Sequence, residues 1–393
     1  MNSLLLRNVL HEGRRTNILV EGNRFACLDA PSDVQAEKVL EADGLAILPA
    51  FYNTHNHAAM VLLRGLGEDL PLQTWLQDYI WPYEDKMTPA DIRKGSEEAI
   101  SEMISSGTVF FSDMYFNIEE TIEAVDKSGM RAAIGITFLD GHSLGQQEEK
   151  LDLLKHWKDP SGGRICLTLD PHAIYTAGPE LFKKVFRLSE ELGMKMHTHL
   201  AETSTEVDDC VKKHGMTPVR YLDSLGVLGP NVIAAHCVHI DKEEWDILAE
   251  RGVTVAHCPC SNMKLGSGRF PYEMAISSGC RITLGTDGAS SNNNLDMREE
   301  MKFSALLAKV SGDPTLLPAA EVFKWATVNG AEAFGIDAGE IKEGKIADAV
   351  LLDSTKKRLQ PDRNLLSNWV YSADSSCISA VLCDGKIITQ NTL

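Results

Sequence analysis

The sequence has no stretch of about 18 consecutive apolar residues, the length that a membrane-spanning helix needs. Its first residues, Met1 to Leu5, also lack the charged segment and apolar core of a secretory signal. We therefore expect a soluble, cytoplasmic protein with no membrane partner. With 393 residues, the chain is long enough for one large domain and a small one.

The chain has few positively charged residues: it contains 38 Lys and Arg and 56 Asp and Glu, which gives a formal net charge of -18. Nucleic acid needs a basic surface, so we expect no nucleic-acid partner. The pattern of base-flipping deaminases, in which Pro-Cys-x-x-Cys follows a His-x-Glu, is also missing, since Pro259-Cys260 continues without a second cysteine at that spacing. A neutral or cationic small molecule fits better, and the sequence leaves a homo-oligomer open.

None of the nine cysteines belongs to a pair spaced as in structural zinc sites or redox centres. Cys258 and Cys260 are separated by a single residue. In a reducing compartment, free cysteines behave as small apolar core residues. We therefore expect no disulfides.

Short strands and turns are predicted at both ends of the chain. Residues 1–47 and 342–393 alternate apolar and polar side chains, with turn signals such as Gly22-Asn23 and Asp384-Gly385. Both ends are predicted to form one discontinuous β domain, which leaves residues 48–341 for a second domain.

Between the ends, apolar segments alternate with amphipathic helical stretches. Eight such strand–helix units predict a (β/α)8 barrel. The long connection between the first two strands predicts helices over the mouth of the barrel. The predicted strands are residues 47–57, 108–114, 131–137, 165–172, 195–202, 232–239, 254–262 and 281–288.

Histidines and carboxylates occur where the predicted strands end, which in a (β/α)8 barrel is the active face. His55 and His57 are two residues apart on an extended segment, so both side chains point to one face and can bind one ion. Further polar residues at this face are Asp113, His172, His197, His199, Glu202, His236, His239, His257 and Asp287.

A catalytic metal takes three or four protein ligands and keeps one position open. His55, His57, Asp287 and one histidine of the fifth strand supply such a set. Spacing does not choose between His197 and His199, because both face inward. The sequence thus predicts a metal site with one ligand left open.

Acid/base groups accompany these ligands. Glu202 lies just past the fifth strand, where it can handle the proton of a metal-bound water. His236 can polarise the leaving group or hold the hydroxide. His239 and His257 are expected to be core histidines. The remaining histidines are expected at the surface: His11, His142, His156 and His214.

Five motifs in this pattern carry a resemblance to a known family. They are His55-Asn56-His57, His199-Leu200-Ala201-Glu202, Ala235-His236-Cys237, the segment from His257 to Leu265, and Gly285-Thr286-Asp287-Gly288. The chain resembles the amidohydrolase superfamily, and within it the branch of methylthioadenosine/S-adenosylhomocysteine deaminases and chlorohydrolases. The resemblance runs over essentially the whole chain.

The resemblance implies a (β/α)8 TIM barrel with a small β-sandwich built from both termini. The implied metal ligands are His55, His57, His199 and Asp287, with His197 outside the ligand set. Dinuclear relatives carry a carboxylated lysine at the end of the fourth strand, and this chain has none there. One divalent metal per chain is expected, zinc in the first place and iron as the alternative.

The implied activity is that of an enzyme, an aminohydrolase that acts on the C–N bond of a cyclic amidine. It would deaminate 5'-methylthioadenosine, S-adenosylhomocysteine or adenosine to the inosine analogue and ammonia, by attack of metal-bound hydroxide on C6. Glu202 would carry a proton from the water to a ring nitrogen. His236 and Asp287 would position the nucleophile, and Asp287 would pass a proton to the departing ammonia.

The resemblance also implies substrate contacts. Trp75 would line the pocket for the base or thioether, Glu84 would accept hydrogen bonds from ribose hydroxyls, and His172 would contact a purine nitrogen. The carboxylate of S-adenosylhomocysteine needs an arginine clamp, and none follows the third strand, where Arg131 lies at the wrong end. This favours 5'-methylthioadenosine or adenosine, unless Arg164 or a partner subunit contributes.

Two alternatives remain open from the sequence. One is a deaminase or chlorohydrolase of another N-heterocycle, such as guanine, a pterin or a triazine, which should not need a ribose-binding group such as Glu84. The other is a non-catalytic metal-binding scaffold. Loss of a ligand or of the acid/base residue would favour the scaffold, and the chain retains all of them.

Overall fold

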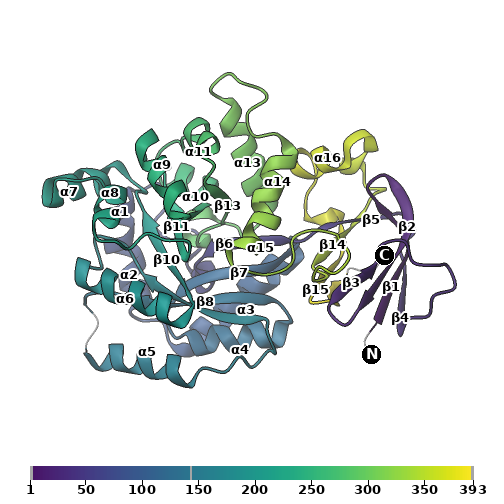
Figure 1. The fold of residues 1–393 in the computed structure, drawn as a ribbon, viewed down its shortest axis with the longest axis horizontal. Helices are drawn as coiled ribbons and strands as arrows, with labels where there is room; N and C mark the ends of the chain where they lie inside the picture. The colour runs from purple at the N-terminus through teal and green to yellow at the C-terminus, as the bar shows by residue number, and fades with distance from the viewer. Residues whose placement is uncertain (1–2, 142–143, 391–393) are drawn as a thin grey trace.

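The computed structural model describes residues 3–141 and 144–390. Figure 1 shows a barrel surrounded by helices and, beside it, a smaller sheet in which both termini lie. Within these residues, no helix is long and apolar enough to span a membrane. His142 and the outermost residues of the predicted terminal domain, 1–2 and 391–393, lie outside the described residues.

Eight parallel strands form the barrel sheet, and each pairs with the next strand along the chain. The first and last strands also meet, because the Asp287 amide donates to the His55 carbonyl at 3.0 Å. The predicted (β/α)8 barrel is therefore confirmed. Its strands are β6 (Phe51–Asn56), β7 (Thr108–Tyr115), β8 (Arg131–Phe138), β9 (Ile165–Pro171), β10 (Lys195–Leu200), β11 (Val232–His236), β12 (Thr254–His257) and β13 (Arg281–Leu284).

Helices follow the strands and bury their apolar faces against the barrel. α9 illustrates why they start and stop where they do: Asp241 and Glu244 form a capping box, and Gly252 ends the helix in a left-handed conformation. The helices after β7 are α4 (Ile118–Ser128), α5 (Leu144–His156), α6 (Pro179–Leu192), α7 (Ser204–His214), α8 (Pro218–Ser224), α9 (Lys242–Arg251), α10 (Pro259–Lys264), α11 (Tyr272–Ser278), α12 (Ala289–Asn292), α13 (Met297–Lys309), α14 (Ala319–Ala326) and α15 (Val328–Ala333).

The connection between β6 and β7 is helical, as the sequence predicts. Its apolar side chains, including Met60, Leu72, Trp75 and Ile80, form a core of their own with Tyr115 at the end of β7. This core places the connection beside the C-terminal ends of the strands. The elements are η1 (Ala58–Leu63), α1 (Leu72–Trp75), η2 (Leu76–Ile80), α2 (Trp81–Glu84) and α3 (Pro89–Ser105).

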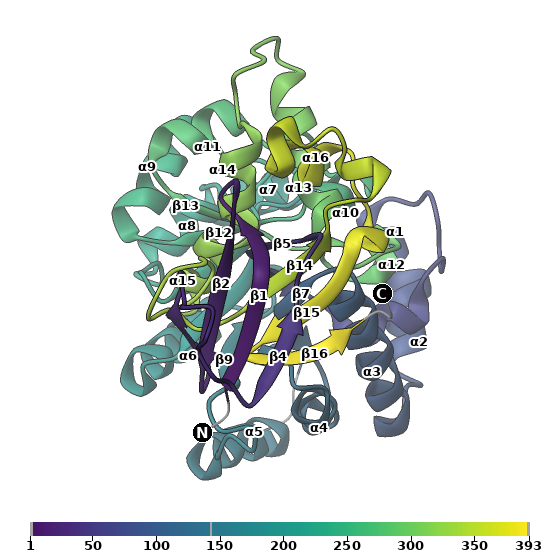
Figure 2. The same ribbon diagram turned by 90° about the vertical axis from the view of Figure 1, so that its right-hand side faces the viewer.

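The second sheet joins both ends of the chain, in the order β16-β15-β14-β5-β1-β2-β3, with β4 paired to β1. Figure 2 shows these purple and yellow strands side by side. The strands are β1 (Ser3–His11), β2 (Arg14–Glu21), β3 (Arg24–Cys27), β4 (Lys38–Glu41), β5 (Leu45–Pro49), β14 (Ala349–Asp353), β15 (Ile378–Cys383) and β16 (Lys386–Gln390). Between β14 and β15 lie η3 (Lys357–Leu359), η4 (Asp362–Asn364), α16 (Leu365–Tyr371) and η5 (Ser375–Cys377).

The prediction of one strand over residues 47–57 is wrong. The segment divides at Pro49 and Ala50, where β5 ends in the terminal sheet and β6 begins in the barrel. β5 pairs antiparallel with β14, whereas β6 pairs parallel with β7. Pro49 has no amide hydrogen to continue a strand ladder, which makes it a suitable place for the chain to leave one sheet for the other.

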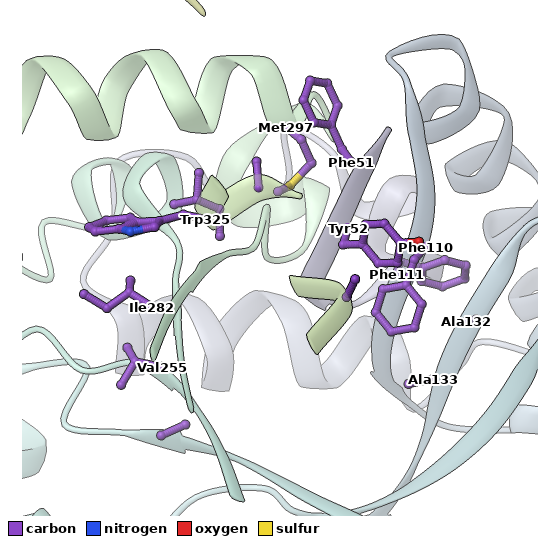
Figure 3. Packing of buried hydrophobic residues seen from close by; sticks show 14 of the residues in the cluster. Phe51, Tyr52, Phe110, Phe111, Ala132, Ala133, Val255, Ile282, Met297 and Trp325 are labelled. Atoms are coloured by element: carbon purple, nitrogen blue, oxygen red, sulfur yellow. The ribbon is translucent and has the colours of Figure 1, made fainter. Parts of the chain in front are cut away.

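Aromatic rings fill the barrel core near the junction with the terminal sheet (Figure 3). Tyr52 stacks on Phe110 with ring centroids 5.5 Å apart, and Phe51 stacks on Trp369 at 5.9 Å. Arg131 crosses from the barrel to the terminal sheet, where its Nε donates to Asp348 Oδ2 at 3.1 Å.

Candidate functional site

A cavity opens at the C-terminal ends of the barrel strands, beneath the β6–β7 connection. Nearly all of the candidate site residues line it, although they come from distant parts of the chain. His55 lies beneath the surface of the cavity and is fully buried. The predicted site residues that line the cavity are His57, Trp75, Glu84, His172, His199, Glu202, His236 and Asp287.

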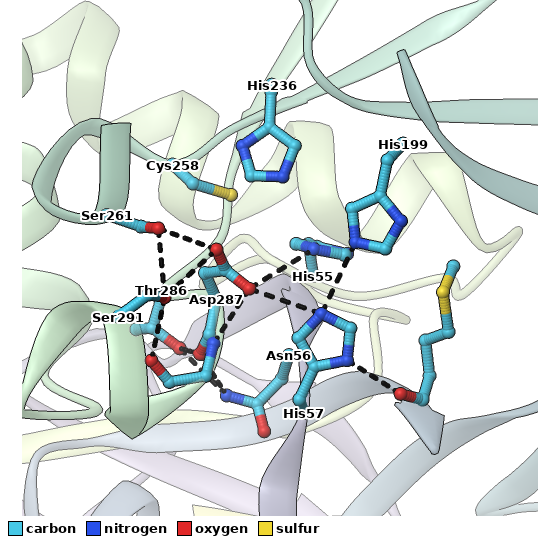
Figure 4. A network of polar contacts seen from close by, with 12 residues as sticks. His55, Asn56, His57, His199, His236, Cys258, Ser261, Thr286, Asp287 and Ser291 are labelled. Atoms are coloured by element: carbon cyan, nitrogen blue, oxygen red, sulfur yellow. Dashed lines mark hydrogen bonds and ion pairs between the residues drawn. The ribbon is translucent and has the colours of Figure 1, made fainter. Parts of the chain in front are cut away.

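Three imidazoles and one carboxylate converge at the floor of this cavity (Figure 4). Asp287 Oδ1 lies 3.5 Å from His55 Nε2 and 3.2 Å from His57 Nε2. His199 Nε2 lies 3.4 Å from His57 Nε2. Potential ligand atoms of His55, His57 and His199 lie within 4.8 Å of one another, as do those of His55, His236 and Asp287.

Hydrogen bonds on the far side of the rings determine which nitrogens face the cluster. His57 Nδ1 donates to the Met114 carbonyl at 2.6 Å, and His199 Nδ1 donates to the His172 carbonyl at 2.8 Å. A neutral imidazole then presents an unprotonated Nε2. His55 Nε2 is buried without a hydrogen-bond partner. This donor set fits a divalent metal ion.

The structure separates the two histidines that spacing alone could not. His197 Nε2 lies 3.1 Å from His55 Nδ1, and its own Nδ1 lies 3.2 Å from Ser112 Oγ. His197 therefore lies behind His55, one layer deeper in the barrel. His199, two residues later, reaches the cluster beside His57.

Asp287 carries the charge that organises the cluster. Burial opposes its ionisation, but its contacts with His55 and His57 hold the pKa of its carboxyl well below the usual range. Burial also opposes protonation of His57, yet the hydrogen bond and the charge of Asp287 raise its pKa to about 9. The pKa of His55 falls to about 4, because burial is the larger effect there.

Glu202 and His236 face the cluster from β10 and β11. His236 Nε2 lies 3.8 Å from Glu202 Oε2, and Ser267 Oγ donates to Glu202 Oε1 at 3.3 Å. Burial raises the pKa of Glu202. A carboxyl group with a raised pKa can accept and release a proton closer to neutral pH than an exposed one.

The sequence analysis did not identify Glu206 as a site residue. Its carboxylate accepts the backbone amides of Ala201 and Glu202, both at 2.9 Å, and so fixes the turn that carries Glu202. The signal was present in the sequence as a second glutamate four residues after the first, in the first turn of α7.

Several strand ends bend through a left-handed backbone conformation that residues other than glycine rarely adopt. Ala201 has φ 50°, His236 71°, Cys237 52° and Asp287 60°. Such outliers gather at functional sites, because the surrounding structure must compensate for the strain. One of the four residues, Asp287, belongs to the cluster, and another, His236, faces it.

The three predicted substrate contacts line the same cavity. Trp75 Nε1 donates to the Leu66 carbonyl at 3.1 Å, which fixes the indole ring. His172 Nδ1 lies 2.8 Å from Thr176 Oγ1. Tyr115, to which the sequence analysis assigned no role, donates its hydroxyl to Glu84 Oε1 at 2.6 Å.

Neither candidate arginine reaches the cavity. Arg131 is bound to Asp348 at the N-terminal end of β8. Arg164 Nη1 donates to the Met130 carbonyl at 2.6 Å, at the N-terminal end of β9. Both guanidinium groups therefore lie at the opposite end of the barrel from the cluster.

The remaining histidines have local partners. His257 Nε2 lies 2.8 Å from the Tyr272 hydroxyl, and His239 Nε2 lies 2.5 Å from the Ser267 carbonyl. His156 is exposed and His214 is half-buried, with its ring stacked on a tyrosine. The expectation for His11 is wrong, because this residue is buried in the terminal sheet.

Comparisons with known proteins agree with this arrangement. A family model described as the amidohydrolase family matches residues 46–388. The chain is 44% identical over 389 residues to a 5'-deoxyadenosine deaminase of Methanothermobacter thermautotrophicus, covering 96% of this chain and 90% of the relative. It is 45% identical over 361 residues to a 5-methylthioadenosine/S-adenosylhomocysteine deaminase of Syntrophomonas wolfei, covering 90% and 84%.

A solved structure with the same fold is that of an adenosine deaminase from Xanthomonas campestris with bound zinc. It superposes with a TM-score of 0.92 at 33% sequence identity. The match covers 98% of this chain and 92% of that one.

Proposed function

This chain belongs to the amidohydrolase family, and from that premise we propose that it is a metal-dependent deaminase of adenine nucleosides. Its substrates would be nucleosides such as 5'-methylthioadenosine, 5'-deoxyadenosine, S-adenosylhomocysteine or adenosine. Water would replace the 6-amino group, to give the inosine analogue and ammonia. The observation that carries the proposal is the convergence of His55, His57, His199 and Asp287 beside Glu202, in a cavity deep enough to take a small molecule.

A divalent metal ion belongs to this site, and we propose that it is zinc. His55, His57, His199 and Asp287 would hold it. When bound, the ion would supply Lewis acidity that lowers the pKa of a water molecule. The zinc found in the related adenosine deaminase supports this choice.

The proton transfers fall to the side chains around the cluster. Glu202 would take a proton from the attacking water and deliver it to a ring nitrogen, which makes C6 of the purine more electrophilic. His236, 3.8 Å from Glu202, would orient the nucleophile. Asp287, which is ionised in the cluster, would take the second proton of the water from the hydroxyl group now on C6. It would pass this proton to the amino group as the C6–N bond breaks, so that ammonia leaves and C6 becomes a carbonyl carbon.

The outer part of the cavity would bind the nucleoside. Trp75 would pack against the base or the 5' substituent. His172 would contact a purine nitrogen. Glu84 would accept hydrogen bonds from ribose hydroxyls, and the hydroxyl of Tyr115 would hold it in place. In this proposal, the catalytic unit lies within the predicted range 48–341 and begins after β5, which ends at Pro49 in the terminal sheet. Residues 1–47 and 342–393 belong to the terminal unit.

Ammonia release tests the proposal directly. Purified zinc-loaded protein would be assayed in parallel with adenosine, 5'-deoxyadenosine, 5'-methylthioadenosine, S-adenosylhomocysteine, guanine and melamine. We expect turnover of the nucleosides and none of the bare rings. Turnover of guanine or melamine alone would contradict the proposal and would remove the assigned roles of Trp75, Glu84 and His172.

A further inference from the structure

We propose that α10 is a positioning element for the reaction, in which Ser261 orients Asp287 and its neighbour Asn262 orients His236. Neither residue contacts the cluster as a ligand. The inference rests on the proposed function, because the tasks of Asp287 and His236 come from it. It extends that function to two residues whose side chains act through other side chains.

Ser261 determines how the carboxylate of Asp287 is turned. Its hydroxyl donates to Asp287 Oδ2 at 2.6 Å, and Ser291 Oγ lies 3.2 Å from the same oxygen (Figure 4). The other oxygen, Oδ1, accepts the Gly288 amide at 2.8 Å and faces the imidazoles. The carboxylate is thus anchored through Oδ2 and presents Oδ1 to the cluster.

Asn262 determines how the ring of His236 is turned. His236 Nδ1 lies 2.8 Å from Asn262 Oδ1, and both side chains are almost fully buried. An amide oxygen only accepts hydrogen bonds, so Nδ1 carries the proton and the neutral ring presents an unprotonated Nε2. That nitrogen faces Glu202 across 3.8 Å.

Buried hydrogen bonds hold α10 itself in place. The Cys260 amide, in its first turn, donates to Glu300 Oε2 at 3.1 Å. Glu300 Oε1 in turn accepts Asn292 Nδ2, which also donates to the Thr286 carbonyl, each at 2.7 Å. The helix is thereby tied to the residue that precedes Asp287.

These contacts make one short helix responsible for two reacting groups. Ser261 and Asn262 are consecutive residues, so a movement of α10 would turn Asp287 and His236 together. Groups that hold a ligand or an acid/base residue in orientation typically contribute a factor of about 10 to 100 in affinity or activity. The contributions of the two residues should therefore be measurable separately, that of Ser261 through metal affinity and that of Asn262 through kcat.

The proposed role of Asn262 in orienting His236 is tested with two substitutions of similar size. Asn262→Leu removes the acceptor, and we expect kcat on 5'-methylthioadenosine to fall about 10- to 100-fold with little change in KM. Asn262→Asp keeps an acceptor for His236 Nδ1. We expect it to retain more activity than Asn262→Leu, again with little change in KM.

The proposed role of Ser261 in orienting Asp287 is tested without substrate. Zinc affinity of Ser261→Ala would be measured by competition with a chelating dye, and we expect it to fall about 10- to 100-fold because Asp287 loses its anchor. Ser291→Ala, which removes the longer contact, should have the smaller effect. An unchanged zinc affinity in Ser261→Ala would overturn this half of the inference.

Asn231→Leu is the matched control. Asn231 lies at the opposite end of the strand that carries His236, where its Nδ2 donates to Ser189 Oγ at 2.6 Å. This variant should keep the wild-type kcat and KM. Equal losses of kcat in Asn262→Leu and Asn262→Asp would show that Asn262 only fills space and would overturn the inference.

Failure of the proposed function is distinguishable from failure of the inference. If the wild-type protein releases no ammonia from any adenine nucleoside, the proposed function fails, while the zinc measurement on Ser261→Ala still reports on positioning. If the wild type is active and the variants match it, only the inference fails.

Discussion

Two buried polar clusters lie at opposite ends of the barrel strands, and they differ in how their atoms are paired. At the N-terminal end, Arg131 donates to Asp348 and Asp384, and the Tyr52 hydroxyl donates to Asp348 at 2.5 Å. At the C-terminal end, His55 Nε2 is buried without a hydrogen-bond partner, and two other imidazole nitrogens face each other.

This difference separates a structural cluster from a functional one. Both contain buried charges, which in isolation are costly. The Arg131 cluster offsets that cost with hydrogen bonds between the barrel and the terminal sheet. The histidine cluster leaves lone pairs directed at one point, so its pairing becomes complete only when a cation arrives.

The largest expected effect comes from disabling the proton carrier of the functional cluster. Glu202→Gln should lower kcat by a factor of about 10² to 10⁴, because the amide cannot accept and release the proton. Metal content, measured by elemental analysis, and thermal stability should stay at the wild-type level. Glu190→Gln, on an exposed position of α6, is the control. Loss of metal from Glu202→Gln would mean that the assigned roles are wrong.

Arg131→Met tests the structural cluster. It leaves the buried Asp348 carboxylate without its cation, and we expect a loss of about 3 to 5 kcal/mol in the free energy of unfolding. kcat/KM of the folded fraction should not change, because the cluster lies at the far end of the barrel. Urea unfolding and ammonia release measure the two quantities. An Arg131→Met variant with wild-type stability and low kcat/KM would contradict the assignment of the Arg131 cluster as structural.

The pH dependence of stability should come from the functional end. Burial raises the pKa of Glu206 to about 7, although two backbone amides oppose the shift. The folded state keeps this proton up to about pH 7, whereas the unfolded state releases it near 4.5. Stability should therefore fall as pH rises between these values, by up to about 3 kcal/mol, and level off above.

Glu206→Gln supplies the comparison for this prediction. The neutral amide has no proton to lose, so the slope of stability against pH should become flatter over the same range. Urea unfolding at a series of pH values measures it. An equal slope in the variant and the wild type would assign the pH dependence to other groups.

The smallest effect is expected at the outer part of the cavity. Glu84→Gln should raise KM for 5'-methylthioadenosine by about tenfold, which corresponds to the loss of a hydrogen bond to a charged acceptor. A 2',3'-dideoxy analogue lacks the ribose hydroxyls, so its KM should not change. Equal changes for both nucleosides would show that Glu84 shapes the cavity without binding the ribose.

Much of the barrel could be predicted from the sequence, because its strands are continuous apolar runs that end in polar residues. The division of the first segment at Pro49 could not be predicted. Apolar residues continue on both sides of Pro49, and only the partner strands differ. Pairing partners are a property of the folded chain. A pattern of residue types carries no information about which of two sheets a strand joins.

The site was predictable where residue type determines chemistry, as for the imidazoles of His55 and His57. The role of a residue was not predictable where contacts between distant parts of the chain determine it. His197 and His199 have the same parity on one strand, and only the depth of the barrel separates them. Ser261 and Asn262 lie in one of the motifs that carry the family resemblance, but nothing in the sequence identifies their partners, and Glu206 lies in no such motif. Their importance comes from the side chains and amides that the fold brings to them.

The terminal sheet has a consequence for synthesis of the protein. β5 pairs with β14, and about 300 residues separate the two strands along the chain. A ribosome adds roughly 5 to 20 residues per second, so β5 waits with an open edge for about 15 to 60 seconds. During that time the N-terminal strands can pair with other nascent chains. This exposure ends only after β14 has left the ribosome.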